Sequence, residues 1–349
     1  MLGENSPLFS RGVRGINHNP FKIRLNPILS KVDFTAICRK LSQDFNGSMK
    51  GVPSLSPLPR WGLGWGGRHR GDGDGKLLIM NIDSPIPKNA RGRFYHLDCA
   101  PGELAPYILT CGDPDRARRV ARRLTRVDMR RKNREFLTYT GIYQNIPVSV
   151  MATGIGAPAS AIAIVEAANC VTPVTFIRLG TCGALQEDIE VGDLVITASA
   201  RRDENTTHAY APADFVPQAA PSIVAALTEA AGNLKAPYHV GLTCTTADFY
   251  AGQGREAPGF PTLDPHKVAR LSQAGVLNLE MEMSAYLTLA AVSPYRIRAG
   301  GVCLVLNNRV TSQGLPAAHA RRRAERRLID VGLRALAILA ARDQREQKF

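Results

Sequence analysis

The chain has 349 residues, of which 44% are hydrophobic and 21% are charged, and its formal net charge at pH 7 is +14. This length allows one large α/β domain or two small ones, and the charge suggests an anionic ligand or partner. No apolar run approaches the roughly 18 residues of a membrane-spanning helix. The seven cysteines lack the paired spacing of a disulfide framework or a zinc site. We therefore expect a cytoplasmic protein without a metal.

The first 79 residues differ in composition from the rest of the chain. They carry twelve Lys or Arg against five Asp or Glu, and residues 60–75 hold too much glycine to order without a partner. Two interpretations stay open. One is a basic arm that contacts nucleic acid or a membrane, and the other is a disordered or non-native extension before a natural start at Met80. The absence of strand or helix periodicity favours the second, so we place the folded domain at residues 80–349.

From residue 94 onward, strand patterns alternate with helix patterns, which indicates an α/β fold. The Gly112–Arg116 turn joins the first strand to the first helix and places backbone N–H groups and Arg116 around a potential anion. Asp115 could equally cap the helix, so Asp113 and Asp115 are expected to be structural. The predicted strands are 106–111, 134–141, 146–151, a strand that begins at 174, 191–197, 238–246 and 299–306. The predicted helices are 117–124, 159–168, 222–231, 286–291 and 317–341.

The strand that begins at Val174 carries the most informative pattern. It runs into Arg178 and then into Gly180-Thr181-Cys182-Gly183. Because ligands of α/β sheets bind at the carboxyl ends of strands, a guanidinium, a hydroxyl and bare backbone N–H groups meet there. These groups suit phosphate. On this stretch alone, an ordinary strand with a solvated arginine and a glycine turn remains an equal alternative.

Two later segments carry further polar groups. Phe249, Gln253 and Arg255 lie on one short loop, and their planar donors and acceptors suit the edge of a nucleobase. Glu280 and Glu282 interrupt an apolar run before a helix, where unpartnered carboxylates are costly. Ribose hydroxyls would satisfy them. A helix N-terminal glutamate accounts for one of the two carboxylates but not for both.

Four motifs together resemble the hexameric nucleoside phosphorylases, the family of bacterial purine nucleoside phosphorylase and uridine phosphorylase. They are Gly112-Asp113-Pro114-Asp115-Arg116, Thr153-Gly154-Ile155-Gly156, Arg178-Leu179-Gly180-Thr181-Cys182-Gly183 and Glu280-Met281-Glu282. The resemblance runs from about Tyr95 to the C-terminal helix and leaves out residues 1–79. It implies a single-domain, three-layer α/β/α sandwich around a mixed, twisted central sheet.

The resemblance also implies roles for individual residues. The phosphate site would comprise Gly112, Arg116, Arg178, Gly180 and Thr181, with Arg134 from a neighbouring subunit. The ribose site would comprise Thr181, Glu280, Met281 and Glu282, with His96 from the neighbour, and the base site Phe249, Gln253 and Arg255. The catalytic residues would be Arg178, Gln253, Arg255, Glu282 and Arg309. The two residues that the neighbour supplies imply a homo-oligomer of at least two chains, and the family resemblance implies a hexamer built from dimers.

The base site favours a pyrimidine. Gln253 and Arg255 match the Gly-Gln-x-Arg pattern of uridine phosphorylases, and Asn308-Arg309 stands near the place where purine enzymes carry a catalytic aspartate. We therefore expect phosphorolysis of uridine, with phosphate as co-substrate and without a cofactor. Cys111, where the family usually has proline, and the proline-rich loop after Arg255 depart from the pattern.

Three alternatives stay open. A purine nucleoside phosphorylase or a hydrolytic nucleosidase would use the same fold, which does not fix the chemistry. A hydrolase would not need the three arginines Arg116, Arg134 and Arg178. A nucleic-acid-binding protein would explain the charge, but the basic residues are spread over the N-terminal segment and two helix faces without interleaved aromatic residues.

Overall fold

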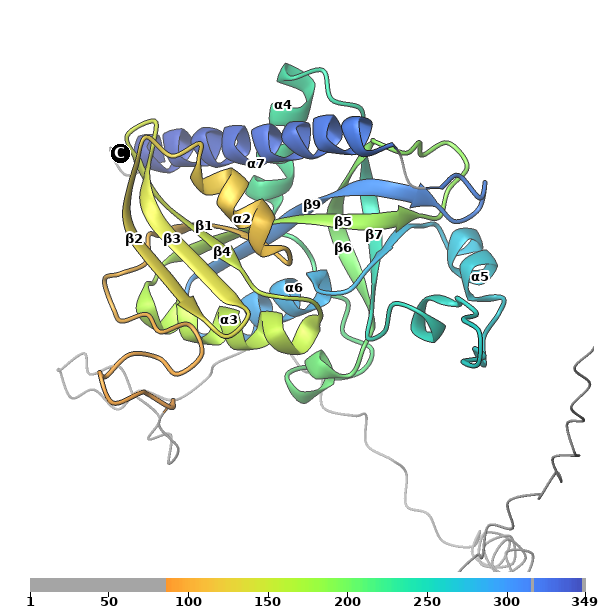
Figure 1. Ribbon diagram of the computed structural model, residues 1–349, viewed down its shortest axis with the longest axis horizontal. Helices are drawn as coiled ribbons and strands as arrows, with labels where there is room; N and C mark the ends of the chain where they lie inside the picture. The colour runs from red at the N-terminus through yellow and green to blue at the C-terminus, as the bar shows by residue number, and fades with distance from the viewer. Residues whose placement is uncertain (1–85, 315–316, 347–349) are drawn as a thin grey trace, which may run out of the picture. The chain divides into compact units, whose positions relative to one another are not determined.

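The computed structural model describes residues 86–314 and 317–346, so the prediction for residues 1–79 lies outside the described part of the chain. Nine strands form one sheet (Figure 1). They are β1 (Tyr107–Cys111), β2 (Arg126–Asn133), β3 (Phe136–Tyr143), β4 (Ile146–Ala152), β5 (Val174–Ala184), β6 (Leu194–Asp203), β7 (Tyr238–Thr246), β8 (Val276–Glu280) and β9 (Ile297–Asn308). The α-helices are α2 (Pro114–Ala121), α3 (Ala157–Cys170), α4 (Pro221–Asn233), α5 (Lys267–Gln273), α6 (Met283–Val292) and α7 (Ala318–Glu346).

The sheet is mixed, and part of it closes on itself. Its order is β2-β3-β4-β1-β5-β8-β7-β6-β9, and β9 also pairs with β5. The long strand β5 pairs in parallel with β1 and β9, and its last residues pair antiparallel with β8. The strands β5, β8, β7, β6 and β9 therefore form a closed ring, which the sequence did not predict. The mixed, twisted sheet was predicted correctly.

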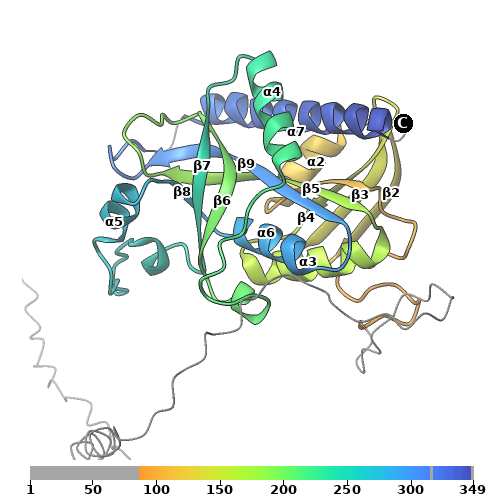
Figure 2. The ribbon, with the colours of Figure 1, turned by 180° about the vertical axis from the view of Figure 1, so that it is seen from behind.

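Helices cover both faces of the sheet, as the three-layer prediction requires (Figures 1 and 2). On one face α2, α4 and α7 bury alanine, leucine and valine side chains against β1, β5 and β9. On the other face α3 and α6 pack against the opposite side of the same strands. Neighbouring residues of β1 show the alternation, because Ile108 faces the α3–α6 layer and Leu109 faces the α7 layer. Among the helices of the described residues, none is long and apolar enough to span a membrane.

Some boundaries differ from the predicted ones for identifiable reasons. Helix α2 begins earlier than expected, because Asp113 caps it by accepting from the N–H groups of Asp115 and Arg116, at 2.8 and 3.2 Å. Strand β2 was missed because it is an edge strand with exposed charged residues. Strand β5 does not turn at Gly180 but continues to Ala184, since both of its sides are paired there.

Candidate active site

A cavity of about 590 Å³ lies where β1, β4, β5, β8 and β9 end. Parallel pairing brings the carboxyl ends of β1, β4, β5 and β9 to one edge, where α/β folds bind ligands, and the end of β8 reaches the cavity from a strand antiparallel to β5. The structure brings most of the predicted site residues together in its wall: Gly112, Arg116, Arg178, Thr181, Phe249, Gln253, Arg255, Glu280, Met281 and Glu282. Gly180, His96, Arg134 and Arg309 are not among the residues that line it.

Arg178 is buried, and its guanidinium folds back over its own strand. A Cβ atom on Gly180 would lie 1.8 Å from Nη1 of Arg178, so the side chain fits only because residue 180 has no side chain. Gly180 thus leaves space for the guanidinium of Arg178 and does not itself line the cavity. Burial alone would lower the pKa of Arg178, but the carboxylates of Glu282 and Glu280 outweigh it and raise that pKa. Arg178 therefore stays charged.

Two glutamates, Glu280 at the end of β8 and Glu282 just after it, make different contacts. Glu280 accepts from the backbone N–H groups of Glu282 and Met283, both at 2.9 Å, and from the hydroxyl of Thr245 at 2.5 Å. It therefore caps the N-terminus of α6. Burial raises the pKa of Glu280, although the Arg178 charge opposes this. Glu282 accepts from the guanidinium of Arg178 and, at 2.7 Å, from the N–H of Gly156.

Arg116 enters the cavity from the first turn of α2 and is 8% exposed. Its Nε donates to Glu325 of α7 at 2.8 Å, and its Nη1 donates to the carbonyl oxygen of Leu179 in β5 at 3.0 Å. Thr181 lies two residues further along the same strand and lines the same cavity. Arg116, Arg178 and Thr181 thus provide two cationic groups and a hydroxyl at one end of the cavity.

The other end of the cavity carries the aromatic residue and the amide. The guanidinium of Arg255 stacks on the ring of Phe249, with its central carbon 4.6 Å from the ring centroid. Gln253 is buried, and its Nε2 donates to the hydroxyl of Thr246 at 3.1 Å. Burial lowers the pKa of Arg255, and burial together with the charge of Arg255 lowers the pKa of Arg309 to about 10. Arg309 does not line the cavity but lies directly behind its wall, since a Cβ on the lining residue Gly183 would be 3.3 Å from Cγ of Arg309.

The side chain of Asn308 does not line the cavity. Its side-chain NH₂ donates to the carbonyl oxygens of Gln186 and Ile189, both at 2.8 Å, and its oxygen accepts from the N–H groups of Val310 and Thr311. Asn308 therefore holds the loop that follows β9. Its neighbour Asn307 lines the cavity instead. Sequence reasoning missed this because adjacent residues of a strand point to opposite sides, and the alignment of one motif does not fix which side faces the ligand.

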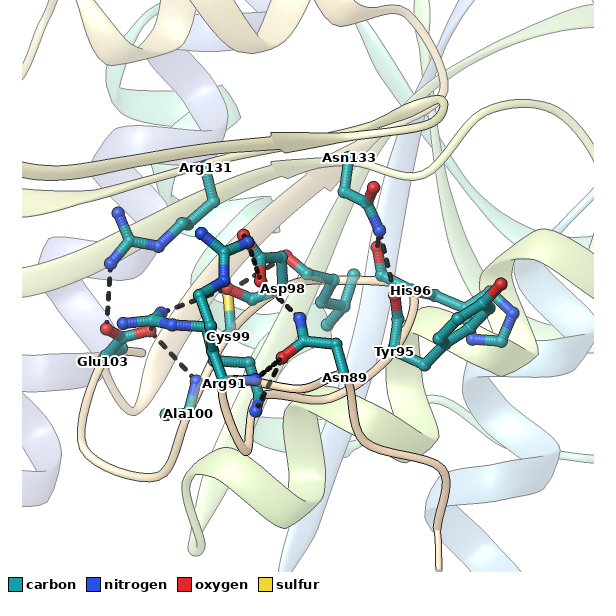
Figure 3. A network of polar contacts seen from close by, with 12 residues as sticks. Asn89, Arg91, Tyr95, His96, Asp98, Cys99, Ala100, Glu103, Arg131 and Asn133 are labelled. Carbon is teal, nitrogen blue, oxygen red and sulfur yellow. Dashed lines mark hydrogen bonds and ion pairs between the residues drawn. The ribbon is translucent and has the colours of Figure 1, made fainter.

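His96 and Arg134 lie outside the cavity and close to each other. Arg134 donates to the hydroxyl of Tyr95 at 3.1 Å, and the rings of Tyr95 and His96 meet edge to face at 5.0 Å. Glu166 of α3 accepts from the backbone N–H groups of His96 and Leu97 and lies 2.7 Å from Nδ1 of His96. Asn133 of β2 ties this segment to the sheet by donating to the carbonyl oxygens of Tyr95 and His96 (Figure 3).

The sequence analysis assigned no individual role to Glu325 or to Gly154. Glu325 lies 209 positions from its partner Arg116, in a helix whose other charges suggested only a solvated face. Gly154 was noted only within a motif. Its carbonyl oxygen would be 2.9 Å from a Cβ on Gly112, so the two loops of the phosphate end touch through their backbones. In the described residues no group of three or more His, Cys, Asp or Glu is arranged to hold a metal ion.

Comparison with known proteins bears on this site. Residues 106–340 match the model of the phosphorylase superfamily. The uridine phosphorylase of Thermococcus kodakarensis is 40% identical over 271 residues, which are 76% of this chain and 94% of that one. A DeoD-type purine nucleoside phosphorylase of Brevibacillus brevis is 34% identical over 245 residues, 70% of this chain and 98% of that one. A Trypanosoma brucei nucleoside phosphorylase with uridine phosphorylase activity has a TM-score of 0.67 at 24% identity, covering 72% of this chain and 99% of that one, which confirms the fold.

Proposed function

The chain belongs to the phosphorylase superfamily, and we propose that it is a pentosyltransferase that cleaves uridine with inorganic phosphate to uracil and ribose 1-phosphate. Phosphate is the co-substrate, and no cofactor takes part. The observation that carries the proposal is the composition of the cavity wall, which combines Arg116, Arg178 and Thr181 with the loop residues Phe249, Gln253 and Arg255. Glu282 lies in the same wall. The 40% identity to a uridine phosphorylase supports the choice of substrate.

At the phosphate end, Arg116, Arg178 and Thr181 bind and align the nucleophile. Phosphate carries its own charge, so the protein needs to supply orientation more than activation. Glu282 accepts from Arg178 and thereby holds the guanidinium, and its carboxylate is the acceptor for the ribose hydroxyls. One buried ion pair thus links the phosphate-binding and ribose-binding parts of the site. In-line attack at C1′ breaks the glycosidic bond through an oxocarbenium-like state.

At the base end, Gln253, Arg255 and Arg309 stabilise the charge that develops on the leaving uracil. Nε of Arg255 and Nη1 of Arg309 are buried, and neither has a hydrogen-bond partner within residues 86–314 and 317–346. Arg255 lines the cavity and donates to the anionic leaving group, whereas Arg309 does not line it and acts there through its charge. Preorganised donors of this kind commonly contribute about 3 kcal/mol each to transition-state stabilisation. Phe249 offers an aromatic face for stacking.

Release of free base from a panel of nucleosides, with and without phosphate, tests the function. We expect uridine to be cleaved well, deoxyuridine and thymidine less well, and inosine and adenosine poorly, because a site built around polar partners rejects ligands that leave them unpaired. Faster cleavage of inosine in saturating phosphate would move the protein to the purine branch, to which the Brevibacillus brevis relative belongs. Cleavage that does not need phosphate would make it a nucleosidase.

The working unit in this proposal is at least a dimer, and a hexamer of three dimers by family resemblance. Arg134 and His96 lie together around Tyr95 and outside the chain's own cavity, which is the placement expected of residues that complete a neighbour's site. Arg134 is the first residue of the two-residue turn between β2 and β3 and has φ of +50°, as such hairpin turns require. A mixed dimer of an Arg134→Ala chain and an Arg178→Ala chain should retain one intact site, whereas each homodimer has none. Full activity of a dilute monomer would rule this out.

The cysteines support a cytoplasmic location within the same proposal. The six cysteines in the described residues are buried free thiols. Unpaired thiols are typical of proteins from a reducing compartment.

A further inference from the structure

Arg116 is held on two of its three guanidinium nitrogens before any ligand binds. Glu325 of α7 accepts from Nε at 2.8 Å, and the Leu179 carbonyl oxygen in β5 accepts from Nη1 at 3.0 Å. No described residue hydrogen-bonds to Nη2. Since Arg116 lines the cavity, the nitrogen that is left over is the one available to an anion there.

We propose that Glu325 is a positioning residue for phosphate, which acts by holding Arg116 in the orientation that presents Nη2 to the anion. This inference rests on the proposed function, in which Arg116 binds phosphate. A free arginine side chain loses several rotatable bonds when it binds, and a partner that holds it beforehand removes most of that cost from the binding step.

Glu325 also belongs to a chain of alternating charges that limits its repulsion of an anion. Its Oε1 accepts from Nη2 of Arg119 at 2.8 Å, and the same nitrogen donates to Asp113 at 2.9 Å. The carboxylate therefore lies between two guanidinium groups. Arg116 remains a net cationic group toward the cavity, although its immediate partner is an acid.

Positioning and simple electrostatics predict opposite effects of removing Glu325. Loss of a negative charge near an anion site would by itself strengthen phosphate binding. Loss of the group that orients Arg116 would weaken it. Whether phosphate affinity falls or rises when Glu325 is removed therefore distinguishes positioning from electrostatic repulsion, whatever the size of the change.

The chain offers a matched control in Asp330. This residue also lies in α7, and its Oδ1 is 2.7 Å from Nη1 of Arg123, just after α2. The Arg123–Asp330 pair thus ties the same two elements together but has no member in the cavity wall. If Glu325 only fastened α7 to α2, Asp330→Ala would have the same consequence as Glu325→Ala.

The experiment is calorimetric titration of the full chain with inorganic phosphate. We expect Glu325→Ala to bind phosphate about tenfold more weakly, Glu325→Gln to lose less because it keeps an oxygen acceptor, and Asp330→Ala to bind like the wild type. In an Arg116→Ala background, Glu325→Ala should have no further effect. Unchanged or tighter binding by Glu325→Ala would overturn the proposal, and so would an equal loss in Asp330→Ala.

Steady-state kinetics separates this inference from the proposed function. With uridine as substrate, Glu325→Ala should raise the KM for phosphate and leave the KM for uridine nearly unchanged. A wild-type protein that binds phosphate but does not cleave uridine would overturn the choice of substrate alone, because the calorimetric comparison does not depend on the nucleoside. A wild-type protein that does not bind phosphate would overturn both.

Discussion

Arg178 and Glu282 form a buried ion pair across 104 positions of the chain, between β5 and the start of α6. The pair is more than a contact inside the core, because both residues line the cavity. Glu280 lies on the other side of the guanidinium, 3.7 Å from Nη1. One arginine therefore balances two buried carboxylates and at the same time faces the phosphate end of the site.

Arg178→Ala should destabilise the fold as well as abolish phosphate use. It leaves two buried carboxylates without a counter-charge, and breaking a buried pair on one side costs about 3–5 kcal/mol. Adding Glu282→Gln to the same chain should restore part of this loss. Urea denaturation of the two single variants and the double variant measures the coupling. Additive losses would show that the two side chains do not depend on each other.

Gly180→Ala should disturb the site and also lower stability, because it overpacks two buried side chains. The new methyl group would lie 1.8 Å from Nη1 of Arg178 and 2.6 Å from Sγ of Cys303, so the guanidinium must move. A displacement of about 1 Å can reduce kcat/KM on the order of 100-fold. Gly232→Ala in α4 is the matched control, since nothing lies within 4 Å of its Cβ position. Wild-type kinetics in Gly180→Ala would contradict the observed path of the Arg178 side chain.

Thr246→Val should weaken uridine binding selectively. The hydroxyl of Thr246 accepts from Nε2 of Gln253 at 3.1 Å and so fixes the orientation of that amide. Loss of this hydrogen bond should weaken the binding free energy of uridine by about 1 kcal/mol, because the amide is no longer held in place. This corresponds to roughly a fivefold higher KM for uridine. The KM for phosphate serves as the internal control. A parallel rise in both constants would indicate general damage to the site.

Asp343→Asn should lower the stability of the fold near pH 7, and this loss of stability should be smaller at acidic pH. Burial raises the pKa of Asp343, but hydrogen bonds from Arg298 and Tyr107 outweigh it, so that this pKa lies below the ordinary value. A carboxyl with a depressed pKa in the folded state stabilises the protein above its unfolded pKa of about 3.9. That contribution is lost as the pH falls through the folded pKa.

Thermal denaturation from pH 7 down to pH 3 measures this dependence. The difference in Tm between wild type and Asp343→Asn should be largest near neutral pH and should shrink below about pH 4. Asp214→Asn is a suitable control, because Asp214 is exposed and has no ion pair within the described residues. A constant difference across the range would assign the effect to packing instead of charge.

Much of this protein follows from local sequence. β-Branched runs predict most strands, including β7 with the observed bounds, because such residues favour a pleated backbone. The polar residues that follow these strands are predicted to lie close together, because the carboxyl ends of parallel strands meet at one edge of the sheet. The phosphate end, the base end and the paired glutamates were all expected on these grounds, and the cavity brings them together.

Only the tertiary structure decided how these residues divide their work. Two glutamates in one motif look equivalent in sequence and both line the cavity, yet Glu280 accepts from the N–H groups at the start of α6, whereas Glu282 accepts from Arg178 and from the N–H of Gly156. Asn308 is saturated by backbone groups, while Asn307 faces the site. The partner of Arg116 comes from the last helix, Glu325. The hydrogen-bond partner of a side chain depends on which helices and strands pack together. Elements that pack together can be far apart in the sequence, so no local sequence pattern predicts the partner.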